Sequence, residues 1–354
     1  MASESTSGSP SQVVELKSPG IKPDTRLQVF TKTFHVHSII LKQHSRFFRT
    51  FMDSIDKSTA PAGLWKYDYV AVCDDDGYWG LESAAIASLE FSSVASSTGM
   101  QEELLAFEKL LCAFYNRPYE ILDLAELELL ARQADFYGAS PVFSASLTSA
   151  LFRSPGLTMY IEKDALDLMY LAYQLRQPIL FRECLGYVVG RDTPGYEGIN
   201  SYHDPTPKIY KIPKIQCILA KAKAQIANLT NSISLELYRS LCGTSIADQE
   251  TKKLVADCIH VLTPFHNTGV DWNPTFYHTF YILFRAKNFG RPRSQLHSNL
   301  AMLCSSNLVL DKGPSLQPIG RIPEFFHCAT IKDEDLPWDQ DEEDWVMAER
   351  TLES

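Results

Sequence analysis

The stretch FHVHSIILKQHSRFF, residues 34–48, decides the fold. Its first four residues alternate apolar and polar side chains, which is the two-residue period of a β-strand. A similar alternation just upstream predicts the partner strand, so residues 24–37 are expected to form a hairpin. Residues 38–52 then change to the spacing of an amphipathic helix. The side chains expected on the apolar stripe of that helix are Ile40, Leu41, His44, Phe47, Phe48 and Phe51.

The three histidines of this stretch raise the question of a metal site. His35 and His37 share one face of a strand, and His44 follows on the predicted helix. A metal needs three or four converging ligands, and no Cys, Asp or Glu stands at a matching spacing. We therefore expect neither a metal nor a cofactor here. His37 and Ser45 are instead interpreted as buried polar residues that find hydrogen-bond partners within the fold.

Composition and charge exclude several classes of function. The chain has 354 residues, of which 45% are hydrophobic and 21% charged, as in an ordinary globular protein. The net charge is −10, but residues 332–354 alone hold ten acids and two bases, which leaves a nearly neutral body. A neutral body lacks the cationic field that drives general nucleic-acid binding. The longest apolar run, residues 276–284, is far shorter than the roughly twenty residues of a membrane span, so we expect no membrane partner.

The cysteines indicate a reducing compartment. The eight cysteines are widely spaced, none forms a CxxC pair, and most lie in apolar runs, so they are interpreted as reduced, buried thiols. The N-terminus has no basic segment followed by an apolar one and therefore no secretory signal. These features predict a cytoplasmic or nuclear protein.

Periodicity divides the chain into four parts. Strands are expected over residues 67–73 and just after 78, joined by a turn at CDDDG, residues 73–77. Asp123 and Glu126 predict a capping box at the start of one helix. Helical patterns are expected over residues 102–115, 124–139, 140–152, 162–177, 179–190, 212–229, 233–241, 248–262 and 273–290. The four parts are a disordered leader (1–22), a mixed α and β domain (23–153), a helical domain (158–310) and a Pro-rich, acidic tail (311–354).

The hairpin and the helix after it resemble the N-terminal half of a BTB (POZ) domain, and two later helices resemble its second half. In the first half the matching positions are Asp24, Leu27, Val29, Phe34, Val36, His37, Ile40, Leu41, Ser45, Phe47 and Phe48. In the second half they are Phe107, Leu110, Leu111, Tyr115, Tyr119, Leu129, Leu130, Ala134, Asp135 and Tyr137. The fold-defining positions that we take from this resemblance are Asp24, Phe34, His37, Leu41, Ser45, Phe48, Tyr115, Ala134 and Asp135.

The resemblance implies an α+β fold, in which a helical cluster is capped by a short β-sheet and an all-α C-terminal domain follows. The divergent middle of the domain is similar to fungal-type members, and residues 172–184 are similar to the helical extension called BACK. Three features depart from the family pattern. Ser38 stands where a base often pairs with the Asp, and residues 1–22 lack the amphipathic helix that is exchanged in dimeric members. The hydrophobic-x-Glu segment by which some members grip a cullin has no clear counterpart in the divergent region 53–104.

No catalytic motif was found: the chain has no G-x-S-x-G, P-loop, dinucleotide fingerprint or H-E-x-x-H, so we expect no enzyme. The resemblance implies a protein–protein interaction module, namely a substrate adaptor of a cullin-type ubiquitin ligase whose C-terminal helices hold the substrate. The alternative is a self-associating or transcription-linked regulatory scaffold with no ligase role. An enzyme of unrecognised type is the third reading.

The acidic tail carries two tryptophans, Trp338 and Trp345, interleaved with acids. It is interpreted mainly as a solvated, disordered terminus. The alternative is a segment that folds on a basic partner groove, with the two tryptophans as candidate partner-binding residues. Residues 331–334, IKDE, also fit a minimal SUMO-acceptor pattern, which is common by chance.

Overall fold

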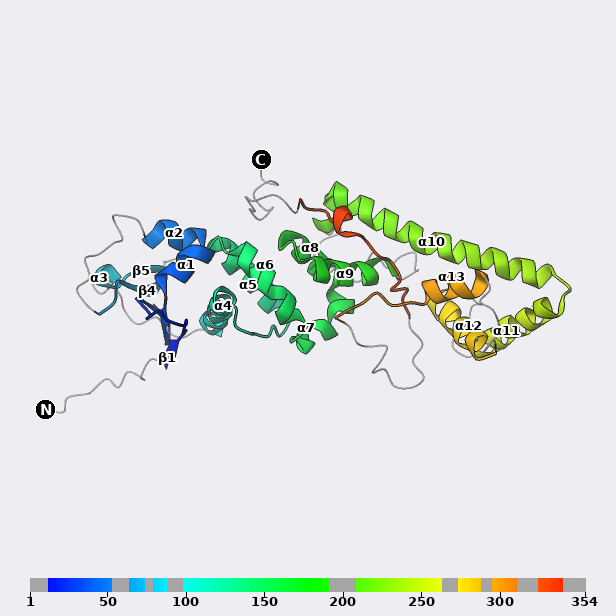
Figure 1. Cartoon of the computed structure of the whole chain (residues 1–354), viewed down its shortest axis with the longest axis horizontal. Helices are drawn as coiled ribbons and strands as arrows, with labels where there is room; N and C mark the ends of the chain where they lie inside the picture. Colours follow the sequence, from blue (N-terminus) through cyan, green and yellow to red (C-terminus); the bar gives the residue numbers. More distant parts are fainter. Residues whose placement is uncertain are drawn as a thin grey trace. The chain divides into compact units, whose positions relative to one another are not determined.

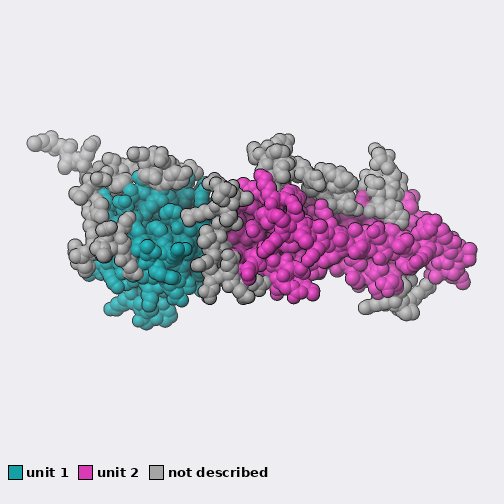
Figure 2. All heavy atoms as spheres, turned by 90° about the horizontal axis from the view of Figure 1, so that it is seen from above, with its two compact units in different colours: residues 1–153, 343–354 teal, residues 154–342 magenta. Residues whose placement is uncertain are grey.

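The computed structural model describes residues 12–52, 64–73, 79–87, 98–190, 208–262, 273–287, 295–310 and 324–339 (Figure 1). The chain divides into two compact units, residues 1–153 with 343–354, and residues 154–342, coloured separately in Figure 2. The first unit combines a sheet with helices, and the described part of the second unit is helical. This confirms the predicted α+β class.

The sheet of the first unit has five strands in the order β1-β3-β2-β4-β5. They are β1 (Gln12–Glu15), β2 (Thr25–Val29), β3 (Lys32–Val36), β4 (Tyr67–Cys73) and β5 (Trp79–Ser83). The predicted hairpin is confirmed, because β2 and β3 pair antiparallel, and β4 and β5 form a second antiparallel pair. Strands β2 and β4 run parallel and join the two hairpins. The predicted turn after Cys73 lies outside the described residues.

Strand β1 corrects the predicted leader. Residues 12–15 pair in parallel with β3, and the amide of Leu16 donates to the carbonyl of His35 at 3.0 Å. Leu16 is buried, at 3% exposure, which anchors this edge strand. The short apolar run VVEL therefore forms structure in a segment whose polar composition had suggested disorder. Residues 1–11 lie outside the described residues.

Helices pack beside the sheet in the first unit (Figure 1). They are α1 (Ser38–His44), α2 (Arg46–Met52), α3 (Ala84–Ala87), α4 (Thr98–Phe114), α5 (Leu124–Phe136) and α6 (Ser140–Leu151). Helix α4 covers the sheet through Phe107, whose ring lies 5.9 Å from Phe34 of β3 and 5.6 Å from Trp79 of β5. The predicted cap of α5 is confirmed, because the Asp123 carboxylate accepts the Glu126 amide at 2.9 Å.

The single helix expected over residues 38–52 is broken at Ser45. Ser45 has extended backbone angles, φ −132° and ψ 120°, which end α1 and allow α2 to start in a new direction. Leu41 and Phe48 of the predicted stripe are fully buried, whereas Ile40, His44, Phe47 and Phe51 are only partly buried. The apolar spacing of a helix continues through Ser45 in the sequence. The Ser45 hydroxyl nevertheless forms its hydrogen bond outside α1, and the helix is interrupted there.

The second unit is built around one long helix, α10, with α11, α12 and α13 beside its second half (Figure 1). Its elements are α7 (Pro155–Met159), α8 (Ile161–Gln174), α9 (Pro178–Gly190), η2 (Lys208–Lys211), α10 (Pro213–Cys242), α11 (Ile246–Leu262), α12 (Pro274–Lys287), α13 (Gln295–Leu303) and η4 (Asp333–Asp335). Two predicted helices merge into α10, because its apolar stripe continues through Asn228–Asn231 without a breaker. Helix α13 was not predicted, and the unit begins at residue 154 rather than 158.

Residues 324–339 correct the prediction of a solvated tail. Phe326 is fully buried, and its amide donates to the carbonyl of Gly190 at 2.9 Å. Further along, Gln225 of α10 exchanges two hydrogen bonds with the backbone of Thr330, at 3.1 and 3.2 Å. The Arg182 guanidinium pairs with the carboxylate of Asp333. Phe325 and Phe326, which precede the acidic residues and are buried, thus fix this segment to α9 and α10. The helical unit therefore extends beyond residue 310.

Candidate functional site

The fold-defining positions of the first unit lie mostly in its core. Phe34, His37, Leu41, Ser45, Phe48 and Ala134 are buried, Asp24 and Tyr115 are partly buried, and Asp135 is exposed. Three hydrogen-bonded groups among them connect the strands to the helices. These groups show whether the polar side chains of the stretch 34–48 form a chemical site or only hold the fold together.

Asp24 holds the start of α1. Its carboxylate accepts the Ser38 amide at 2.7 Å, the Ser38 hydroxyl at 2.6 Å and the Thr25 hydroxyl at 3.1 Å. Burial alone would raise the pKa of Asp24, but these hydrogen bonds and the charge of Lys66 lower it below the ordinary value. Ser38 therefore provides a hydroxyl and an amide as the partners of the aspartate.

This carboxylate makes stability depend on pH. Because the folded pKa of Asp24 is lowered, the ionised form stabilises the fold above the unfolded pKa of about 4, and the stabilisation is lost as pH falls through the folded pKa. We expect Asp24→Asn to cost about 1 kcal/mol at neutral pH and progressively less in acid. Thermal unfolding between about pH 3 and pH 7 measures the difference. The control is Asp123→Asn, which exchanges one good N-cap for another; a penalty for Asp24→Asn that is the same at every pH would contradict the assignment.

His37 is satisfied inside the fold, as predicted. Its Nε2 lies 3.1 Å from the carbonyl oxygen of Ile21, and its Nδ1 lies 2.8 Å from the hydroxyl of Tyr115. A carbonyl can only accept, so Nε2 carries the proton and Nδ1 accepts from the tyrosine. The tyrosine oxygen in turn accepts the backbone amide of His37 at 2.8 Å. Burial raises the pKa of Tyr115 to about 12, which keeps this hydroxyl protonated at neutral pH.

Ser45 joins α2 to the end of α5. Its hydroxyl donates to the carbonyl of Tyr137 at 2.6 Å and accepts the amide of Phe48 at 3.0 Å. The amides of Arg46 and Phe47 donate to the carbonyls of Gly138 and Tyr137, both at 3.2 Å. The backbone amides at the start of α2, which have no partner within their own helix, thus donate to carbonyls at the end of α5. The polar residues of this stretch are architectural.

The remaining two histidines point to no metal site. His35 packs on Trp65, with ring centroids 4.4 Å apart, and His44 stacks at 6.2 Å on Phe114. Burial lowers the pKa of His44. Across the described ranges there is no group of three or more His, Cys, Asp or Glu side chains that could hold a metal ion. In the same ranges no helix is long and apolar enough to cross a bilayer.

A partly exposed aromatic cluster lies on the surface of the first unit. Phe47 stacks on Phe51 of the same helix at 4.9 Å and lies 5.5 Å from Phe136 of α5. Phe136 is 57% exposed, whereas Tyr137 beneath it is buried. We call Phe47, Phe51 and Phe136 the α2–α5 aromatic surface. An exposed phenylalanine supported by buried rings is the type of residue that anchors protein interfaces.

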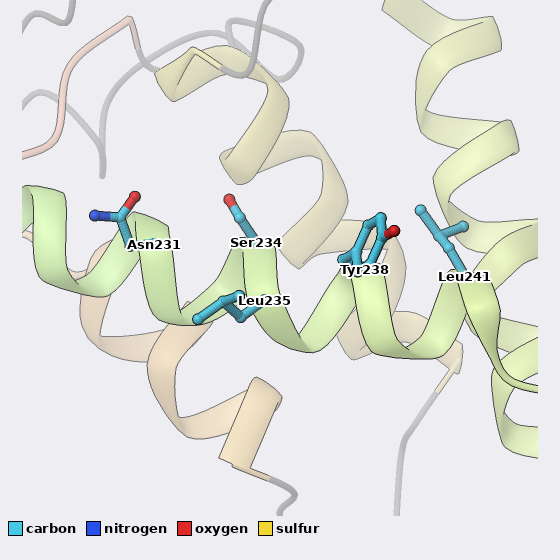
Figure 3. A pocket seen from close by; sticks show the side chains of 5 residues that line it. All are labelled: Asn231, Ser234, Leu235, Tyr238 and Leu241. Carbon is cyan, nitrogen blue, oxygen red and sulfur yellow. The ribbon is translucent and has the colours of Figure 1, made fainter.

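The second unit has a shallow hollow on α10, shown in Figure 3. It has a volume of about 590 Å³ and is lined by Asn231, Ser234, Leu235, Tyr238 and Leu241. The Ser234 hydroxyl is hydrogen-bonded to the hydroxyl of Tyr277 in α12 at 3.0 Å. Leu235 and Tyr238 are 58% and 67% exposed. The five described residues that line it include no charged group and no nucleophile–base pair, so they suit the binding of an apolar side chain or helix.

Trp338 is not a free anchor. Its ring packs edge-on against Phe181 of α9, with centroids 5.5 Å apart. This contact lies within the second unit, and Trp338 is partly exposed, so its role as a partner-binding residue stays a prediction. Trp345 lies outside the described residues. Lys332, the lysine of the IKDE pattern, is exposed and pairs with Glu334 at 3.1 Å.

The cysteines are less uniformly buried than predicted. Cys184 and Cys258 are buried, whereas Cys217 and Cys242 are exposed on α10. Burial raises the pKa of Cys184 well above its ordinary value and that of Cys258 to about 12, so both are weak nucleophiles. The prediction of buried thiols is therefore wrong for Cys217 and Cys242.

Neither exposed surface was predicted from the sequence, because motifs and apolar period indicate core positions rather than exposed ones. The signal available for α10 was a second apolar row, Leu235 and Tyr238, offset from the core stripe that contains Ile233 and Leu237. Comparison with family models, with curated proteins and with solved structures found no match to this chain.

Proposed function

We propose that this chain is a protein–protein interaction module of the BTB/POZ type that acts as a substrate adaptor of a cullin-type ubiquitin ligase. The observation that carries the proposal is the α2–α5 aromatic surface, in which Phe136 is 57% exposed and its ring lies 5.5 Å from that of Phe47. The helical second unit would hold the substrate. Its BACK-like region, residues 172–184, supports the same assignment.

The mechanism is recognition without chemistry. Phe136 enters an apolar pocket of the scaffold and loses contact with water, while Phe47 and Phe51 hold its ring in position. Because these three side chains are already packed together, little side-chain freedom is lost when the scaffold binds. Affinity then comes from apolar burial by a few anchors, and the polar surroundings supply specificity.

The adaptor proposal predicts that Phe136→Ala weakens binding to the cullin of the same organism. Loss of a central aromatic anchor costs about 2 kcal/mol, which corresponds to a roughly thirtyfold increase in Kd. Calorimetric titration of the full chain with the N-terminal part of that cullin measures the change. Phe152→Ala is the matched control, because Phe152 at the end of α6 is 54% exposed but lies outside the aromatic surface. No measurable affinity of the wild type for the cullin would refute the adaptor role.

The second candidate function is a self-associating scaffold with no ligase role. It is favoured by a different observation, the exposed apolar residues on α10, which lie in the helical unit. Light scattering of the purified chain separates the two functions when it is combined with the cullin titration. A self-associating chain with no cullin affinity is a scaffold, and a chain that binds the cullin is an adaptor whether or not it self-associates.

A further inference from the structure

Helix α10 is apolar on two opposite sides in its second half. One side, with Ile233 and Leu237, is fully buried in the second unit. The other side is open to solvent although it carries Leu235 at 58% and Tyr238 at 67% exposure. A helix with apolar residues on both sides is typical of a helix covered on both sides. Figure 3 shows Leu235 and Tyr238 on the outer part of the helix.

The exposed residues on this side follow the spacing of paired helices. Asn228, Asn231, Leu235, Tyr238 and Cys242 are separated by three, four, three and four residues, and all five are exposed. We call these five residues the α10 outer row. Alternation of three and four is the pattern by which two helices interlock side by side. Asparagines within such a row favour a partner that offers matching polar groups at the same level.

Charge along α10 restricts where a partner helix can lie. Residues 208–223 contain five lysines and no acid, and one of these lysines, Lys221, pairs with the carboxylate of Asp335 at 3.1 Å, so two copies of this part would bring like charges together. Residues 227–242 contain only Glu236 and Arg239 as charged residues, and these two pair with each other at 2.7 Å. The second half of the helix is therefore neutral, in a chain whose net charge is −10. A neutral surface can face its own copy without electrostatic cost, which a two-fold contact requires.

We infer that two copies of this chain associate through the α10 outer row. Leu235 and Tyr238 form the apolar centre of the contact, and Asn228, Asn231 and Cys242 lie toward its ends. Each asparagine then meets an amide, a hydroxyl or a thiol of the other copy, so the polar groups remain paired. This inference is independent of the cullin proposal, which concerns a surface of the first unit.

The size of the contact sets its expected strength. A seam of about four helical turns buries less than the roughly 1,600 Å² of a standard interface, so the dimer should exchange with monomer. We expect the mean mass to rise with concentration from about 1 µM to several hundred µM. Equilibrium sedimentation of the full chain over this range measures the association.

Leu235→Glu places a charge at the centre of the row and should abolish this association step. Tyr238→Ala removes the larger anchor and should raise the dimer Kd about tenfold. Ala220→Glu is the matched control, because Ala220 is exposed on the same helix but lies outside the row. All substituted residues are solvent-exposed, and circular dichroism at low concentration confirms that each variant is folded.

The quantity compared is the difference in mean mass between the wild type and each variant. This difference still reports on the α10 outer row if the first unit also self-associates, because the variants leave the first unit unchanged. A drop for Leu235→Glu with a wild-type profile for Ala220→Glu supports the inference. A wild type that loses no mass on dilution overturns it, as does a Leu235→Glu variant with the wild-type profile. The Phe136 titration is unaffected by either result, so failure here is distinct from failure of the adaptor role.

Discussion

Replacing Gly190 by alanine is expected to destabilise the second unit by about 3 kcal/mol, because the new methyl group has no room. Gly190 ends α9 where the chain of residues 324–339 crosses it. A Cβ on Gly190 would overlap the carbonyl oxygen of Phe326 and lie 3.0 Å from its carbonyl carbon. These are backbone atoms of a residue whose own side chain is fully buried, so they cannot move aside easily. The hydrogen bond from the Phe326 amide to the Gly190 carbonyl would be lost with the contact.

The measurement is the unfolding temperature of the second unit, which should fall by roughly 8 °C for a unit of this size. Gly186→Ala in the same helix is the graded control. A Cβ there meets the end of the Leu308 side chain at 3.0 Å, which can rotate away, and lies at ordinary contact distance, 4.0 Å, from the His327 ring. A smaller loss is therefore expected for Gly186→Ala. If the two variants had the same unfolding temperature, the close approach of residues 324–339 to α9 would not contribute to stability.

The first unit could be predicted largely from sequence because its signals are local. The hairpin follows from alternation in residues 24–37, and the cap of α5 follows from Asp123 and Glu126. The break at Ser45 could not be predicted, since it depends on the carbonyl of Tyr137, which lies 92 residues away in the chain. Apolar period describes one helix at a time and contains no information about hydrogen bonds to a distant helix.

In the second unit, the polar composition of residues 324–339 predicted disorder, but a few apolar side chains in this segment are packed in the core. Residues 324–339 are rich in acids, but Phe326 and Leu336 are buried. Strand β1 shows the same effect at the other end of the chain, where Leu16 anchors a polar segment. Average polarity predicts disorder only when no residue in the segment reaches a core.

The candidate surfaces were harder to predict than the core, because exposure is a property of the assembled fold. Phe136 and Tyr137 are adjacent aromatic residues, yet one is 57% exposed and the other is buried. Tyr137 follows Leu130 and Ala134 in the buried row of α5 at helical spacing, whereas Phe136 lies about 100° away around the helix. The period separates the two faces, but the assembled fold decides how much of Phe136 stays exposed.

Glu183 provides the second large effect, because it is a carboxylate almost without solvent contact. It is 1% exposed on α9 and accepts the backbone amides of Val309 at 2.8 Å and Leu310 at 3.1 Å. The hydrogen bond of the Leu310 amide is buried and that of the Val309 amide is partly buried, so the carboxylate supplies a partner that water replaces poorly. Glu183→Ala removes both acceptors and leaves a cavity, and we expect a loss of about 3 kcal/mol in the free energy of unfolding of the second unit.

Glu183→Gln separates hydrogen bonding from packing. The glutamine keeps the shape and one acceptor oxygen, but its NH₂ group faces the second backbone amide, so an intermediate loss of about 1–2 kcal/mol is expected. Denaturant unfolding gives the free energies, and hydrogen exchange at the amides of Val309 and Leu310 tests the contact itself. Glu162→Ala, at an exposed glutamate of α8, should change neither quantity. Unchanged exchange at both amides in Glu183→Ala would mean that the carboxylate does not hold this segment, and that residues 295–310 are fixed by the apolar contacts of α13 alone.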